Sequence, residues 1–249
     1  MAQLTAVILC AGRGTRIRDL TRAPKCLLEI DGHSLLQRQI TALQRCGVDR
    51  IRVVTGYEQQ MIRDHVNARI GGKGIEFVHN PDYEALGNTH SMWLGIRDVT
   101  SHCLIFDGDL LFPPSILQEF LRDGGNGFVV GDGSLDDIEC AKALVDDTAR
   151  VRLLVDKRAV TPVELERYRF VGEAMGIIGV PACEMIGLAA RCETYLSAPE
   201  HGLDNWEKFF NVYLDERPYG FWQTKNADWT EIDTLDDFRK AGGVIPALS

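Results

Sequence analysis

The chain has 249 residues, of which 45% are hydrophobic, so it can bury a sizeable core in one large or two small domains. Its formal net charge of -9 argues against a nucleic-acid backbone or an anionic membrane surface as a general partner. No apolar run reaches the roughly 18 residues that a membrane span needs. Seven cysteines without a CxxC pair indicate reduced thiols in a cytoplasmic protein, and we expect neither a signal peptide nor a transmembrane helix.

The first half of the chain alternates strand-like and helix-like segments. Apolar, β-branched runs occur at residues 4–10, 50–56, 74–80 and 102–109, separated by helix-like stretches at 34–47, 59–72 and 87–99. This alternation predicts parallel strands with crossover helices that cover both faces of a sheet. We therefore expect an α/β fold with a three-layer, Rossmann-like, mixed but mainly parallel sheet. Ligands of such sheets bind beyond the carboxyl ends of the strands.

From about Gly124 the pattern changes. Strand-like segments at 126–132, 140–147 and 150–157 follow one another with short polar turns, which predicts antiparallel structure or a mixed sheet edge. Further strands are expected at 173–180 and 220–224, helices at 183–196 and 205–216, and a last helix from near Leu235 that Thr234 would cap. We expect a single domain over residues 1–249, with roughly residues 133–217 as an inserted, acceptor-binding lobe.

The first strand ends in a glycine-containing loop, CAGRGTR, at residues 10–16. Two glycines let the backbone turn tightly and present N–H groups to phosphate oxygens, and the arginines add donors for the same oxygens. The GxGxxG spacing fails at Ile17, and the P-loop pattern is absent. A plain structural turn is the alternative. The nucleotide-binding candidates in this loop are Cys10, Ala11, Gly12, Arg13, Gly14 and Thr15.

Basic residues are concentrated in the same region. Residues 13–25 carry Arg13, Arg16, Arg18, Arg22 and Lys25 against Asp19 alone, in a chain with 27 basic and 36 acidic residues. Lys25 follows a proline about a dozen residues after the glycines, so it can return to the loop as a point charge on a triphosphate. The alternative is a solvated surface lysine, but the apolar residues 26–28 that follow it argue against this.

The motif DGD follows the fourth strand, at residues 107–109. Triphosphate chemistry usually needs Mg²⁺, held by one or two carboxylates together with substrate oxygens. Asp107 is the first candidate ligand. A tight turn at the end of a strand is the competing interpretation of an isolated DGD.

Residues 9–40, LCAGRGTRIRDLTRAPKCLLEIDGHSLLQRQI, resemble the signature region of the nucleoside-triphosphate transferase family, which includes sugar-1-phosphate nucleotidyltransferases and small cytidylyltransferases. The resemblance implies a triphosphate bound by the loop, with its α-phosphate gripped by the catalytic candidates Arg16 and Lys25. It also implies that Asp233, in EIDTLDDF before the last helix, is the second metal ligand beside Asp107. Glu231 and Asp236 would be neighbours or helix-start acids.

The middle motif, GNTHSM at residues 87–92, resembles the segment found in phosphocholine and aminoalkylphosphonate cytidylyltransferases rather than the GTAxA type of sugar enzymes. This implies CTP as the nucleotide. Asn88 and Ser91 would lie one helical turn apart and could reach the base or ribose together. Alternatively, Asn88 and Thr89 only cap the helix that follows.

The resemblance implies that a phosphate or phosphonate oxygen attacks the α-phosphorus of CTP and releases pyrophosphate. The acceptor candidates are phosphocholine, 2-aminoethylphosphonate or hydroxyethylphosphonate, and the expected acceptor contacts are Lys157, Glu173, Trp206 and Tyr213. Aromatic residues beside acids suit an ammonium group, although most such aromatics belong to cores.

Two other functions stay open. One is a sugar- or polyol-phosphate nucleotidyltransferase, which is favoured if Lys157 lines the cleft while the aromatics are buried away from it. The other is a non-catalytic nucleotide-binding subunit, against which the presence of Arg16, Lys25, Asp107 and Asp233 counts. A homodimer is open as well.

Overall fold

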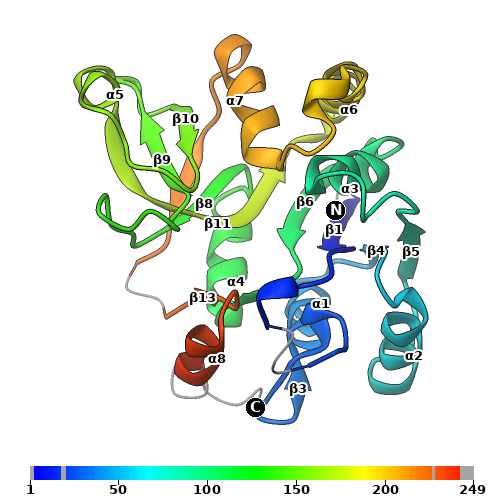
Figure 1. The fold of residues 1–249 in the computed structure, drawn as a ribbon. Coiled ribbons are helices and arrows are strands. Elements are labelled where there is room, and N and C mark those ends of the chain that lie inside the picture. Colours follow the sequence, from blue (N-terminus) through cyan, green and yellow to red (C-terminus); the bar gives the residue numbers. More distant parts are fainter. Residues whose placement is uncertain (1–2, 18–20, 226–227, 242–249) are drawn as a thin grey trace.

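The computed structural model describes residues 3–17, 21–225 and 228–241, and within them nine strands form one sheet (Figure 1). Their order is β10-β9-β11-β6-β1-β4-β5, with β8 paired to β11 and β12 paired to β8. The strands are β1 (Leu4–Cys10), β4 (Arg50–Thr55), β5 (Ile75–His79), β6 (His102–Asp107), β8 (Gly127–Gly131), β9 (Lys142–Val145), β10 (Val151–Val155), β11 (Arg169–Val180) and β12 (Phe221–Gln223).

The half of the sheet around β1 is parallel. β1 pairs in parallel with both β4 and β6, and β4 pairs in parallel with β5. Alternate side chains of β1 enter different cores: Val7 packs on one face of the sheet and Ile8 on the other, and both are fully buried. This arrangement confirms the predicted strands that are covered on both faces.

Helices cover the two faces of the sheet in two sets. One apolar core joins the sheet to α1 (Leu35–Arg45), α2 (Gln59–Arg69) and α4 (Pro114–Arg122), and the other joins it to α3 (Asn88–Ile96), α6 (Ala182–Leu196) and α7 (Trp206–Glu216). The predicted three-layer arrangement is therefore confirmed. Helix α4 was not predicted, although it begins at tandem prolines, and proline is favourable in the first turn of a helix.

The lobe is antiparallel, as the short-turn pattern indicated. β9 pairs antiparallel with β10 and β11, and α5 (Pro162–Arg167) follows β10. β11 belongs to both parts of the molecule: Arg169–Glu173 pairs with β9, and Ile177–Val180 pairs with β6. Gly172 lies at the irregularity within the β9 pairing, and Gly176 lies between the two pairings. Their φ angles are 137° and 69°, a backbone region that favours glycine.

Two helices of the predicted lobe, residues 133–217, also contact the main layers. Helix α6 packs against α3 and β6 in the helical layer, and α7 contacts both β10 and α3. β9, β10, α5 and the first part of β11 lie together at one side of the molecule (Figure 1).

The remaining elements are short. They are the 3₁₀ turns η1 (Thr15–Ile17), η2 (Lys25–Leu27) and η3 (Pro199–His201), the strands β2 (Glu29–Ile30), β3 (His33–Ser34), β7 (Leu110–Leu111) and β13 (Thr230–Glu231), and the helix α8 (Leu235–Ala241). The Asp237 N–H donates to the Thr234 hydroxyl at 3.2 Å, so the predicted cap of the last helix is confirmed.

Over the described residues, no helix combines the length and apolarity that crossing a membrane requires. All seven cysteines are free: five are buried, Cys46 is half-buried and Cys183 is exposed.

Candidate active site

The glycine loop leaves the sheet where β1 ends and meets Lys25. Gly14 has φ of 57°, and a Cβ added there would lie 2.9 Å from the Cβ of Lys25. The loop, Lys25 and Asp109 line a cavity of about 150 Å³, together with Leu9, Cys10, Gly12, Gly14, Cys26 and Gly108. The structure therefore brings Lys25 back to the glycines, as the sequence predicted.

Tyr57 braces this loop from the end of β4. Its N–H donates to the Ala11 carbonyl and its hydroxyl donates to the Arg22 carbonyl, each at 3.0 Å. Arg13 lies over the rings of Tyr57 and Tyr83 and pairs with Glu84. Thr15 is exposed, and Arg18 lies outside the described residues.

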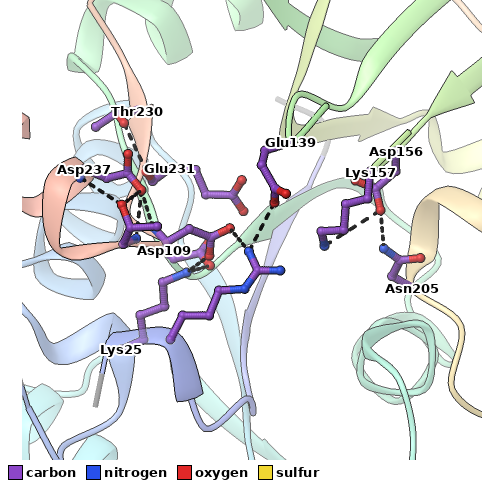
Figure 2. A network of polar contacts seen from close by, with 12 residues as sticks. Lys25, Asp109, Glu139, Asp156, Lys157, Asn205, Thr230, Glu231 and Asp237 are labelled. Atoms are coloured by element: carbon purple, nitrogen blue, oxygen red, sulfur yellow. Dashed lines mark hydrogen bonds and ion pairs between the residues drawn. The ribbon is translucent and has the colours of Figure 1, made fainter. Parts of the chain in front are cut away.

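Lys25 is clamped between two carboxylates. Its Nζ donates to Asp109 Oδ2 at 2.6 Å and to Asp233 Oδ1 at 2.5 Å (Figure 2). Burial would lower the pKa of Lys25, but attraction to these two aspartates outweighs it and raises the pKa. The ammonium is therefore charged at neutral pH and holds together two acids that are 124 residues apart in sequence (233 − 109).

Three carboxylates converge at this point. Asp109, Glu231 and Asp233 each place one oxygen within 4.8 Å of the others. Antiparallel pairing of β7 with β13 produces this convergence, and the Ile232 N–H donates to the Asp109 carbonyl at 3.1 Å. The cluster joins a residue after β6 to residues just before α8.

The cluster has the chemistry of a divalent-cation site. Asp109 Oδ1 is buried and has no hydrogen-bond partner, so it is a free hard oxygen ligand. Burial and repulsion by Asp109 and Asp107 raise the pKa of Glu231. Burial would also raise the pKa of Asp233, but the charge and hydrogen bond of Lys25 lower it. A cation would relieve this crowding of acids.

Asp107 differs from its predicted role. The Trp206 indole N–H lies 3.2 and 3.1 Å from its two oxygens and donates to them, and Asp107 is not one of the three clustered acids. Burial, followed by repulsion from Asp109 and Glu207, raises its pKa. As a correction, Asp109 is the acid that lies with Asp233, because the turn after β6 carries it to β13 while Asp107 remains in the strand.

An acidic cavity of about 400 Å³ adjoins the three-carboxylate cluster. We call it the acidic cavity. Its lining consists of Asp132, Asp137, Glu139, Cys140, Glu173, Asp228, Trp229, Thr230, Glu231, Asp233 and Asp237. Eight of these eleven residues are Asp or Glu, so the cavity favours a positively charged group over a second anion.

Glu173, a predicted acceptor contact, lines the acidic cavity. Burial is the main cause that raises its pKa to about 7. Lys157, the other predicted lobe contact, is half-exposed and has φ of 50°, an uncommon conformation for a non-glycine residue. Its side chain extends from the lobe toward the space in front of Glu139 (Figure 2).

Arg16 crosses this space from the glycine loop. Its guanidinium lies 3.3 Å from Asp233 Oδ2 and 3.4 Å from Glu139 Oε2. It is exposed, so these contacts are weak and can be exchanged for a phosphate. Arg16 therefore faces both the three-carboxylate cluster and the acidic cavity.

Trp206 and Tyr213 do not line the cleft, whereas Trp229 lines the acidic cavity. Trp206 is 2% exposed, and Tyr213 is 3% exposed and donates its hydroxyl to Glu184. Both pack with Phe209 and Phe210 in the core. The prediction that Trp206 and Tyr213 contact the acceptor is therefore wrong, because the amphipathic face of α7 is needed to cover β10.

The two polar residues of the middle motif bind protein partners. Asn88 Oδ1 accepts a hydrogen bond from the backbone N–H of Trp206 at 2.9 Å. Ser91 is 4% exposed, and its hydroxyl accepts a hydrogen bond from the Asn80 side chain. Gly87, rather than Asn88, is the N-cap of α3. In this structure Asn88 therefore ties α3 to the start of α7, and Ser91 is withdrawn from the cleft.

Asp109 was not predicted as a member of the cluster, and Glu231 was predicted only as a neighbour of the metal ligand. Glu139 was not predicted to line the cavity. The DGD motif offered both aspartates, but only the β7–β13 pairing selects the second. The acidic run DGSLDDIE at residues 132–139 was a visible signal for the cavity.

Comparison with proteins of known sequence gives partial matches. The chain is 29% identical to the CMP-5'-(3-aminopropyl)phosphonate synthase of Streptomyces rubellomurinus over 114 residues, 45% of this chain and 18% of that protein. It is 29% identical to the choline-phosphate cytidylyltransferase of Streptococcus pneumoniae over 107 residues, 43% of this chain and 44% of that protein. It is also 30% identical to the UTP--glucose-1-phosphate uridylyltransferase AglF of Haloferax volcanii over 110 residues, 44% of each. The matches thus span less than half of each relative.

Solved structures share the whole fold. The CTP:phosphocholine cytidylyltransferase of Streptococcus pneumoniae superposes with a TM-score of 0.80 at 20% identity, covering 98% of this chain and 100% of that one. The inositol-1-phosphate CTP transferase of T. maritima gives 0.78 at 23% identity, covering 100% and 99%. Residues 6–137 match the MobA-like NTP transferase domain. The chain therefore belongs to the family of MobA-like NTP transferase domains, as the glycine loop and the returning lysine indicated.

Proposed function

We propose that this nucleotidyltransferase transfers CMP from CTP to a small phosphate or phosphonate acceptor that carries an ammonium group, and releases pyrophosphate. Phosphocholine and aminoalkylphosphonates are the acceptor types. The cytidylyltransferases among the relatives and structural neighbours support this proposal, as does the charge distribution in the cleft.

One observation carries the proposal: the cleft has a cationic wall and an acidic wall. Lys25, Arg16 and the glycine loop lie on one side, where a triphosphate needs positive charge and N–H donors. The acidic cavity lies on the other side of the cluster. An acceptor with a phosphate at one end and an ammonium at the other fits both walls at once.

The chemistry needs positioning and charge neutralisation. The acceptor oxygen forms a bond to the α-phosphorus, and the bond to the bridging oxygen of the leaving pyrophosphate breaks. Because a phosphate has a second pKa near 6, the nucleophile is ionised at neutral pH and no general base is required. Lys25 and Arg16 would neutralise the charge on the α-phosphate. Arg16 also contacts Glu139, which lines the acidic cavity.

Mg²⁺ would be held by Asp109, Asp233 and Glu231, whose oxygens converge and include one buried atom without a partner. When bound, it supplies charge neutralisation and a fixed orientation for the triphosphate. Lys25 now occupies two of these carboxylates, so binding of the nucleotide would transfer the ammonium from the aspartates to the phosphates.

A panel of nucleotides and acceptors tests the proposal through pyrophosphate release. We expect turnover with CTP and with phosphocholine, phosphoethanolamine or 2-aminoethylphosphonate, and little with hydroxyethylphosphonate or sugar 1-phosphates. Turnover only with sugar 1-phosphates would overturn it. Tight CTP binding without turnover on any acceptor would indicate a non-catalytic nucleotide-binding subunit.

A sugar- or polyol-phosphate acceptor is the second candidate, and a specific observation favours it. Lys157 is half-exposed at the cleft while Trp206 and Tyr213 are buried away from it. A lysine in this position can bind the phosphate of any such acceptor, and carboxylates can accept hydrogen bonds from hydroxyl groups as well as from ammonium groups. The panel separates the two candidates.

A further inference from the structure

The lobe contains a fully buried lysine that the proposed chemistry does not use. Lys142, the first residue of β9, is 0% exposed. Its ammonium donates to the backbone carbonyls of Asp137, Cys140 and Arg158, at 2.9 Å for Cys140 and 3.3 Å for Arg158. Burying an ammonium is unfavourable unless its donors are satisfied, and here all three reach carbonyl oxygens.

These carbonyls belong to two different loops. Asp137 and Cys140 lie in the loop between β8 and β9, which lines the acidic cavity. Arg158 lies in the loop between β10 and α5 and directly follows Lys157, whose φ is 50°. Lys142 therefore links the loop that carries Glu139 to the loop that carries Lys157.

Glu173 lies beside Lys142. It lies directly opposite Lys142 in the β9–β11 ladder, and its carboxylate lines the acidic cavity. The positive charge of Lys142 is thus placed behind the cavity wall, at the point where both loops and β11 meet. Removal of the charge would release the two loops from each other without touching the glycine loop.

We propose that Lys142 is a positioning residue of the acidic cavity, whose ammonium joins the 132–141 loop to the 156–161 loop so that Glu139 and Lys157 face one acceptor. The inference rests on the proposed function only in naming the cavity an acceptor site. Lys142 acts through the backbone of the two loops and does not contact the acceptor.

The test compares Lys142→Met with wild type and with Lys73→Met, which removes an exposed lysine next to β5. Michaelis constants for CTP and for 2-aminoethylphosphonate are measured separately by pyrophosphate release. Hydrogen exchange is followed in residues 132–141, 156–161 and 11–17. We expect the acceptor KM to rise about tenfold and the CTP KM to stay within about twofold.

Hydrogen exchange should quicken in both lobe loops and stay unchanged in residues 11–17, and Lys73→Met should match wild type. If Lys142→Met does not fold, Lys142→Gln, whose amide has two donor hydrogens, is used with the same expectations. An equal rise in both Michaelis constants, or unchanged exchange in the lobe loops, would overturn the proposal. If wild type turns over no acceptor, the proposed function fails, while the exchange comparison still decides whether Lys142 links the loops.

Discussion

The two walls of the cleft differ in both backbone and charge. The wall that we propose binds the nucleotide, called the nucleotide wall, consists of parallel strands β1 and β6 and a glycine loop, and it presents Arg16 and Lys25. The acceptor wall is formed by the antiparallel lobe and the segment around β13, and most residues of its cavity are acids. The net charge of -9 does not show this separation of charge.

The difference suits the proposed substrates, with the triphosphate on the cationic wall and the ammonium end of the acceptor on the acidic wall. Between the walls lie Asp109 and Asp233, which the Lys25 ammonium bridges. Lys25 contacts the acids of the cluster from the nucleotide wall, and the acidic cavity adjoins the cluster on the other side. Each wall can be altered separately, and the variants below do so in order of expected effect.

The largest effect is expected at the boundary between the walls. Asp109→Ala should lower turnover by about 10³-fold, because it removes a proposed Mg²⁺ ligand and a partner of Lys25. Asp107→Ala, which changes the other aspartate of DGD, should cause a smaller loss of turnover. Turnover and calorimetric Mg²⁺ binding are measured for both variants. A larger loss in Asp107→Ala would show that the sequence-based assignment of the ligand was right after all.

Lys25→Ala removes a cation of the nucleotide wall. We expect kcat/KM for CTP to fall about 10²-fold, because the charge opposite the triphosphate is lost, while acceptor affinity changes little. Steady-state kinetics with each substrate varied in turn measure both effects, and Lys73→Ala is the matched control. Equal losses for the two substrates would mean that Lys25 does not belong to one wall.

Glu173→Gln alters the acceptor wall. Burial raises the pKa of Glu173 to about 7, so only above that pH is its carboxylate mostly ionised and able to pair with an ammonium. The KM for an ammonium acceptor should therefore fall several-fold as pH rises from 6 to 8 in wild type, and stay flatter in the variant. Glu166→Gln, on the exposed face of α5, is the control. The acceptor phosphate also titrates near pH 6, so hydroxyethylphosphonate, which lacks the ammonium, is followed in parallel as a competitive inhibitor. An identical pH response of its inhibition constant would contradict the role of Glu173.

The smallest effect concerns stability. Burial, followed by repulsion from Asp156, raises the pKa of Glu207 to about 8. Between its ordinary value and pH 8 the unfolded chain releases a proton that the folded protein keeps, so this group lowers the free energy of unfolding as pH rises. In Glu207→Gln the free energy of unfolding should therefore decline less steeply with pH, by up to about 1 kcal/mol per pH unit. Urea unfolding at pH 5, 6.5 and 8 measures it, with exposed Glu200→Gln as control; parallel wild-type and variant curves would contradict the assignment.

Prediction from the sequence worked best on the nucleotide wall. There the signal is local: β1, the glycine loop and Lys25 lie within 22 residues (residues 4–25), and the structure brings them into contact. Prediction worked less well on the acceptor wall. Trp206 and Tyr213 are residue types that are common in binding surfaces, but they lie on the face of α7 that packs into the core.

The sequence by itself determined the layered fold, because apolar runs of strand length alternating with amphipathic helices have few other ways to bury their side chains. It also determined the chemistry of the glycine loop, since residues close in sequence are close in space. Only the tertiary structure decided which aspartate of DGD joins Asp233, because that depends on the antiparallel pairing of two-residue strands over 100 residues apart. Contacts of this range leave no periodic pattern in the sequence, and the packing around them selects the partners.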